Sequence, residues 1–182
     1  MRRLLHVILL GLLGAGIIHI AVLLLVPVFS ERDAWSRLAM ASDLYKITRL
    51  DAEAGGAPVV KSVDPMFFAA ACRFDLIDGM VRVKAPGNVP FWSVSVYDRN
   101  GHNIYSFNDH TANGGALDAV VLTPAQMIEV RKDLPEQLQG AIFVEAPIDE
   151  GIFVIRGFVP DDSWKPIVSR FLDQSSCELQ DF

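Results

Sequence analysis

The chain lacks the signatures of the common enzyme classes. Its 182 residues contain no GxSxG nucleophile elbow, no P-loop and no glycine-rich dinucleotide-binding motif. They also contain no HxH, HExxH or CxxC pair, which are the usual spacings of metal ligands. Basic residues form no run outside the N-terminus, and the net charge of -6 argues against a nucleic-acid partner. No motif therefore indicates a cofactor or a metal.

Cysteine is scarce, since Cys72 and Cys177 are the only two in the chain. Cys72 falls in the middle of an expected strand, and Cys177 lies near the C-terminus. In an oxidising compartment, a disulfide between them would close a loop of about 105 residues and contribute roughly 3–5 kcal/mol in the entropic view. Two independent thiols are the alternative.

The N-terminus is rich in apolar residues and poor in charge. No Asp, Glu, Lys or Arg occurs from Leu4 to Phe29, and this run exceeds the about 20 residues that span a bilayer core. Arg2 and Arg3 precede the run, so the positive-inside rule predicts a cytoplasmic N-terminus. A cleaved signal peptide is the alternative, but its apolar region has only roughly 7–15 residues. We expect residues 1–30 to be an uncleaved anchor in a bacterial inner membrane, with the rest of the chain in the periplasm.

Residues 31–56 are predicted to form a juxtamembrane helix and linker. Apolar side chains recur there at helical spacing, and the pair Gly55-Gly56 is expected to end the helix near Glu53. The helix either continues from the membrane past Pro27 with a kink or restarts at Ser30, and the pattern does not choose between them.

Residues 57–182 are expected to form one β-rich domain. Apolar and polar side chains alternate along several short segments separated by turn residues. Asp78-Gly79 is typical of a two-residue hairpin turn, and the residues from Asp98 to Gly101 predict another turn. Strands at about 8–12-residue spacing favour a sandwich or barrel. The expected strands are a short one within 57–63, then Phe67–Leu76, Met80–Ala85, Phe91–Tyr97 and Asn103–Asn108.

The second half of the domain adds helices and strands. Thr123 to Gln126 is a capping box with proline at the first helical position, which predicts a helix over 124–132. A short strand is expected over 118–122, and the apolar segments 141–146 and 151–159 are expected to pair as a hairpin. A last helix is expected from Trp164 to about Gln174. On the first helix, Met127, Ile128 and Val130 are expected to be partly buried. On the last helix, the side chains expected to face the sheet are Ile167, Val168, Phe171 and Leu172.

The first strands also carry a family pattern. Its residues are Asp64-Pro65, Phe74-Asp75-Leu76, Asp78-Gly79, Val81-Arg82-Val83, Pro86 and the segment from Phe91 to Asp98. In these residues the chain resembles the domain of unknown function 1254 family, in the small, single-domain, membrane-anchored version found in alphaproteobacteria. With the anchor, the resemblance implies a mainly β (α+β) fold, in which a transmembrane helix precedes a β-sandwich or jelly-roll-like domain with two or three peripheral helices. It also implies a separately encoded companion that carries the domain of unknown function 1214, and it implies no activity.

Four side chains are the candidates for a ligand or metal site. Asp98, His102, Asp109 and His110 crowd one segment of the chain, although solvated turn residues would give the same pattern. Two hypotheses follow. The preferred one is a single-pass inner-membrane protein whose periplasmic domain is a non-enzymatic protein- or ligand-binding module working with the companion. The alternative is a metal-binding or hydrolase-like envelope enzyme that uses these four residues. The sequence predicts no oligomeric state.

Overall fold

The computed structural model describes residues 2–51, 59, 64–87 and 89–180. For residues 27–34 and 113 it describes the backbone but not the side chains. Helix α1 (Arg2–Ala41) is continuous over 40 residues and passes Pro27 without a break. It ends at Ala41, so the expected end near Glu53 is wrong. Tyr45 has a φ of 59°, and its N–H donates to the carbonyl of Arg73 at 2.9 Å. This turn leads into strand β1 (Ile47–Arg49), whose backbone pairs with a sheet instead of extending the helix.

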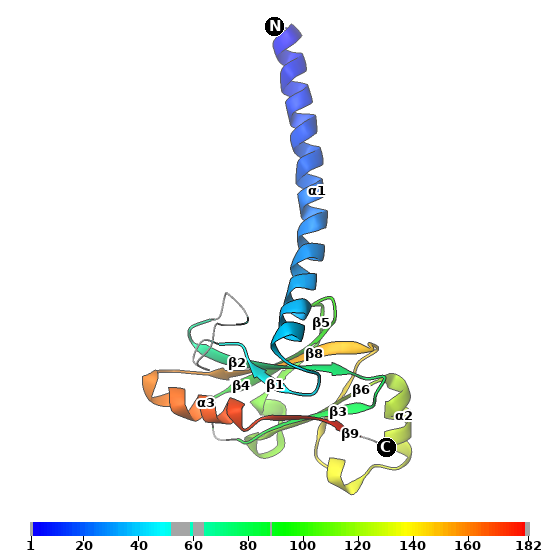
Figure 1. The fold of residues 1–182 in the computed structure, drawn as a ribbon, viewed down its shortest axis with the longest axis vertical. Helices are drawn as coiled ribbons and strands as arrows, with labels where there is room; N and C mark the ends of the chain where they lie inside the picture. The colour runs from blue at the N-terminus through cyan, green and yellow to red at the C-terminus, as the bar shows by residue number, and fades with distance from the viewer. Residues whose placement is uncertain (1, 52–58, 60–63, 88, 181–182) are drawn as a thin grey trace.

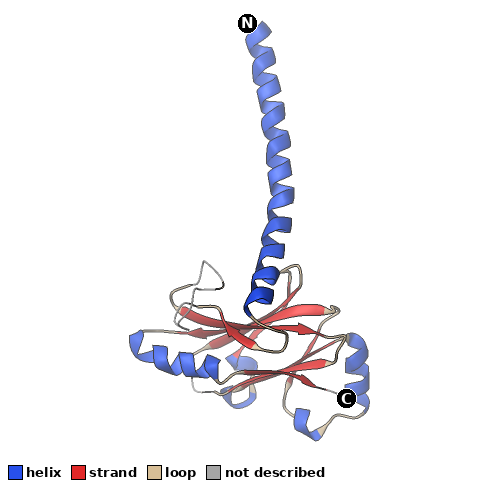
Figure 2. Cartoon of the chain, viewed as in Figure 1, coloured by secondary structure: helices blue, strands red, loops and turns tan. Residues whose placement is uncertain are grey.

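The described strands form two sheets, one of five strands in the order β1-β2-β8-β4-β5 and one of four in the order β7-β6-β3-β9. The sheets stack face to face (Figures 1 and 2), so the prediction of a mainly β fold with peripheral helices is confirmed. Neighbouring strands are antiparallel except β6 and β7, which are parallel. The remaining strands are β2 (Phe67–Asp75), β3 (Met80–Ala85), β4 (Trp92–Asp98), β5 (Asn103–Asn108), β6 (Leu117–Leu122), β7 (Ile142–Glu145), β8 (Glu150–Phe158) and β9 (Ser176–Gln180).

Two expected hairpins are wrong. Asp78-Gly79 connects β2 to β3, and these strands belong to different sheets, so the turn carries the chain across the sandwich. The same holds for β7 and β8, because β8 lies between β2 and β4 while β7 pairs with β6. Among the expected turns, Asp98 to Gly101 does join paired neighbours, β4 and β5. The strand expected within 57–63 lies outside the described residues, apart from Val59.

The space between the sheets holds the main core. As predicted, alternate residues of β2 and β4 point inward, and helix α3 (Lys165–Asp173) closes one side of the sandwich. Ile128 was expected to be partly buried and Ile167 to face the sheet, but both are exposed because they lie on the solvent sides of their helices. The core side chains of these elements are Phe68, Ala70, Cys72, Phe74, Trp92, Val94, Val96, Val168, Phe171 and Leu172.

Each sheet also packs against a helix on its outer face. Helix α2 (Pro124–Lys132) covers the four-stranded sheet with Met127 and Val130. The end of α1 stands on the five-stranded sheet, where Trp35 and Leu38 are buried (Figure 1). Small side chains of β2 and apolar ones of β8 form this contact: Ala69, Ala71, Ile152 and Val154. The C-terminal end of α1 is therefore packed directly onto the domain, while the apolar segment before it is not.

The capping box at the start of α2 is formed as predicted. The hydroxyl of Thr123 accepts a hydrogen bond from the Gln126 N–H at 3.3 Å, and the Gln126 side chain accepts one from the Thr123 N–H at 2.8 Å. We expect Thr123→Ala to lower the free energy of unfolding by about 1 kcal/mol, because a helix N–H loses its partner. Urea unfolding measures this. Thr123→Ser keeps the acceptor and serves as the control, so an equal loss in both variants would contradict the capping role.

Candidate functional site

The structure places Asp98 and His102 together in the turn between β4 and β5. Asp98 Oδ2 lies 2.8 Å from His102 Nδ1, and Asp98 Oδ1 accepts the N–H groups of Asn100 and His102. Burial acts to raise the pKa of Asp98, but the hydrogen bonds from His102 outweigh it and hold the pKa below its usual value. The pair stabilises the turn, and the His102 side chain faces solvent.

Asp109 and His110 lie at the opposite end of β5. They form a 3-10 turn, η2 (Asp109–Thr111), and the His110 N–H donates to the side chain of Asn108 at 3.2 Å. Because β5 separates the two pairs, the four predicted side chains do not converge. In the described part of the chain, no group of three or more His, Cys, Asp and Glu side chains is placed to hold a metal. The metal-site hypothesis therefore lacks its geometry.

The two cysteines are joined by a disulfide that links the sheets. Cys72 lies on the inner face of β2, and Cys177 lies on β9 of the other sheet, with their Cα atoms 6.5 Å apart. The sequence left this bond as one of two alternatives and did not predict β9. The bond ties the last strand to the five-stranded sheet across the core.

A groove of about 480 Å³ opens beside this disulfide. It lies where β1 and β9 form the edges of their sheets on the same side of the sandwich. Its lining carries charges of both signs and hydroxyl groups, which suits a polar ligand more than an apolar one. The strand-edge and polar residues of the lining include Lys46, Ile47, Arg49, Asp173, Ser176 and Glu178.

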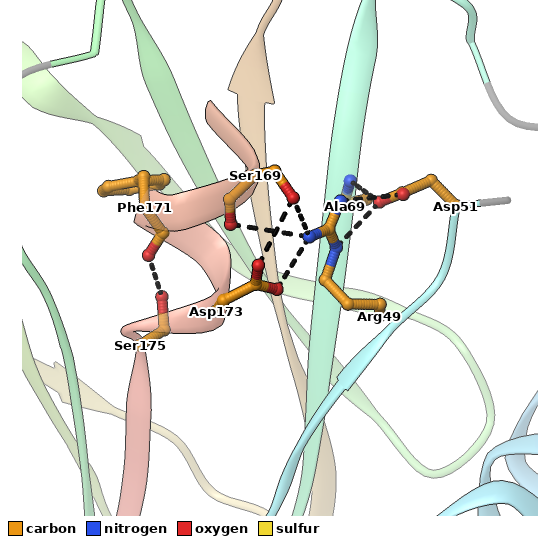
Figure 3. Close-up of polar contacts among 7 residues, drawn as sticks. All are labelled: Arg49, Asp51, Ala69, Ser169, Phe171, Asp173 and Ser175. Carbon is orange, nitrogen blue, oxygen red and sulfur yellow. Dashed lines mark hydrogen bonds and ion pairs between the residues drawn. The ribbon is translucent and has the colours of Figure 1, made fainter. Parts of the chain in front are cut away.

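Arg49 fixes the wall of the groove (Figure 3). Its Nε and Nη2 donate to the two oxygens of Asp51 at 3.1 and 2.8 Å, while Nη1 donates to Ser169 Oγ at 2.9 Å and to Asp173 Oδ1 at 2.8 Å. Asp51 Oδ2 also accepts the Ala69 N–H at 3.0 Å. Burial acts to lower the pKa of Arg49, but both carboxylates outweigh it and raise the pKa. This network fastens β1 to β2 and α3.

Within the described residues, β1 is an edge strand, and some of its backbone groups do not bond to β2. The Leu50 N–H donates to the Ala69 carbonyl at 2.8 Å, and hydrogen-bonded residues alternate along an antiparallel strand. Thr48 therefore bonds to β2, whereas the N–H and C=O groups of Ile47 and Arg49 point away from β2 on the groove side. An edge of this kind accepts an added strand. Sequence reasoning missed this edge because it assigned residues 47–49 to a helix.

The family comparison covers most of the groove, with Tyr45 and Lys46 just outside the matched residues. The family described as Protein of unknown function (DUF1254) matches residues 47–178, from the first residue of β1 into β9. The chain belongs to this family. The DUF1254 match thus includes both groove edges and leaves out the apolar part of α1. No curated protein matches the chain.

Two crystal structures are similar to this DUF1254 protein. One is the VPA0106 protein from Vibrio parahaemolyticus, with 11% identity and a TM-score of 0.49, covering 64% of this chain and 28% of that one. The other is an uncharacterized protein from Burkholderia cenocepacia, with 14% identity and a TM-score of 0.48, covering 73% of this chain and 36% of that one. The chain thus spans well under half the length of either protein.

Proposed function

We propose that this DUF1254 protein is anchored in a bacterial inner membrane by α1 and binds an extended segment of another protein along β1. The observation that carries the proposal is the free backbone edge of Ile47 and Arg49 in the groove. In strand addition, main-chain hydrogen bonds supply affinity and flanking side chains supply specificity. The function is then binding and not catalysis.

The apolar helix supports the anchoring part. An 18-residue window within Arg2–Val26 has a mean hydropathy of 2.7, and none of that window is buried against the domain. Exposing apolar surface to water costs about 25 cal/mol per Å², so a helix of this kind is stable in hydrocarbon and unstable in water. The arginines before it favour a cytoplasmic N-terminus and a periplasmic domain. A disulfide between the sheets suits that oxidising compartment.

The groove charges support a peptide-like ligand with polar side chains. Lys46 lies beside the β1 edge, and Glu178 lies on β9 across the groove. A strand added between them would meet Lys46, which pairs with Asp43 at 2.8 Å, on one side and the Glu178 carboxylate on the other. These groups would help to select its register and direction. The partner we propose is the separately encoded companion carrying the domain of unknown function 1214.

A photoreactive residue introduced at Lys46 tests the partner in living cells. We expect it to crosslink the companion, because its side chain lies in the groove. Lys132 on α2 is the matched control, since its side chain is 65% exposed and that of Lys46 is 66% exposed. Mass spectrometry identifies the adduct. Equal adducts from both positions, or none from Lys46, would contradict the proposed site.

Hydrogen exchange on the purified complex tests the binding mode. The amides of Ile47 and Arg49 should exchange quickly in the free protein and slowly in the complex, while the Thr48 amide stays protected in both. Protection of no β1 amide would rule out strand addition. Extraction of the full chain by alkaline carbonate would independently overturn the anchoring part.

A further inference from the structure

A second polar cluster lies on the outer face of the five-stranded sheet, beside the end of α1. Arg156 of β8 donates from Nη1 to Ser95 Oγ and from Nη2 to Tyr97 Oη, both at 3.1 Å. Ser106 of β5 donates to Ser95 Oγ at 3.1 Å, and the Asn103 side chain donates to Ser106 Oγ at 2.9 Å. Three neighbouring strands therefore place one guanidinium among hydroxyl and amide groups.

Arg156 carries a positive charge among neutral polar partners. Among the described residues it forms no ion pair, whereas Arg49, Arg82 and Arg99 each pair with an Asp or Glu. A guanidinium has five N–H donors, so the two bonds to hydroxyls leave donors for a ligand. The planar fork of an arginine suits the oxygens of a phosphate group, and hydroxyl groups complete such a site.

The positive charge of Arg156 affects the pKa of the neighbouring Tyr97. Its burial acts to raise the pKa of the phenol, but the hydrogen bonds from Arg156 and Ser95 outweigh burial and lower the pKa. Tyr97 also packs against the apolar cluster under α1, which contains Trp35 and Ile152. The cationic cluster is therefore adjacent to the point where the helix meets the sheet.

The outer face of the five-stranded sheet is the face from which α1 rises (Figure 1), so with α1 in a bilayer this face is turned toward the membrane. Trp35 follows Val26, the end of the apolar segment, by a helical rise of about 14 Å. The interfacial layer extends roughly 5–8 Å beyond the hydrocarbon core on each side. An average helix tilt of about 20° brings one side of the sheet face still closer to the lipids. On the side that leans toward the bilayer, headgroups then come within reach of the sheet face that carries Arg156.

We propose that Arg156, Tyr97 and Ser95 bind the phosphate of an anionic phospholipid headgroup. The inference rests on the proposed membrane anchoring, since α1 sets the distance between the sheet and the bilayer. The bound phosphate accepts hydrogen bonds from the remaining guanidinium donors, and the Tyr97 hydroxyl, which accepts from Arg156, donates its own proton to the phosphate. Binding of this kind fixes which side of the domain leans toward the membrane.

Native mass spectrometry of the full chain, released from detergent with added lipid, tests the site. We expect the unaltered protein to bind its first phosphatidylglycerol about tenfold more tightly than phosphatidylcholine, because the choline cation of phosphatidylcholine offsets the charge of its phosphate. Arg156→Gln should abolish this preference. Arg131→Gln, on α2 over the other sheet with a side chain 72% exposed, should keep it. Tyr97→Phe, which retains the ring and the cation, should reduce it about threefold.

The outcomes separate the possibilities. An unchanged preference in Arg156→Gln overturns the site, and if that variant fails to fold, an unchanged preference in Tyr97→Phe does so. Inorganic phosphate that displaces phosphatidylglycerol from Arg156 overturns the lipid assignment in favour of a soluble anion. An unaltered chain that alkaline carbonate strips from membranes overturns the anchoring and this inference together. A carbonate-resistant chain without lipid preference overturns this inference alone.

Discussion

Replacing Arg49 with alanine is expected to lower the free energy of unfolding by about 3–5 kcal/mol. The Asp51 side chain is only 4% exposed, and it accepts two hydrogen bonds from Arg49 and one from the Ala69 N–H. Without the guanidinium, a carboxylate stays in the protein interior with one amide as its partner. Urea unfolding of the full chain in detergent gives the free energy.

Asp173 provides the matched control, because it contacts the same guanidinium from the surface. Its side chain is 57% exposed, so Asp173→Asn should cost less than about 1 kcal/mol. Replacing Arg49 with methionine and Asp51 with leucine together should restore most of the stability, since no unpaired buried charge remains. Equal losses in Arg49→Ala and Asp173→Asn would show that burial of Asp51 is not the cause.

Removing the disulfide is expected to have a similar effect. Cys72 and Cys177 are 105 residues apart, and the entropic view assigns about 4–5 kcal/mol to a loop of this length. The double variant Cys72→Ala with Cys177→Ala should unfold at a much lower urea concentration than the oxidised protein. Alanine is chosen because Cys72 is fully buried and a serine would leave a hydroxyl in the core.

Reductant supplies the control for this prediction. Dithiothreitol should destabilise the natural chain by about the same 4–5 kcal/mol and leave the double variant unchanged. An unfolding curve of the natural chain that does not respond to full reduction would contradict the stabilising role. Cys177 lines the groove, so reduction should also loosen β9 and the wall that it forms.

Much of the layout follows from local patterns in the sequence. The inner faces of β2 and β4 are predictable because side chains alternate across a strand whatever its neighbours are. Helix α2 is predictable because Thr123 and Gln126 satisfy helix N–H groups within a few residues. These features depend on interactions between residues close in the chain, and the structure confirms them.

The strand partners do not follow from such patterns. Asp78-Gly79 has the same turn chemistry whether the chain returns to one sheet or crosses to the other. β8 is buried on both faces, so its sequence pattern does not indicate which strands lie beside it. β1 has only three residues, too few to separate a strand period from a helical one. The groove was therefore not predictable, because it depends on which strands lie at the edges. Arg156 and Tyr97 are far apart in sequence and meet only through the pairing of β4 with β8.

The unbroken path of α1 from its apolar segment to the sheet limits how the groove can meet a partner. A helix without a hinge transmits rotation about its own axis but does not let the domain rise or sink. With α1 in a bilayer, rotation of the helix about its axis turns the groove in different directions but keeps its distance from the lipid surface constant. A partner anchored in the same membrane then searches in two dimensions, and its own binding segment must be held at that height.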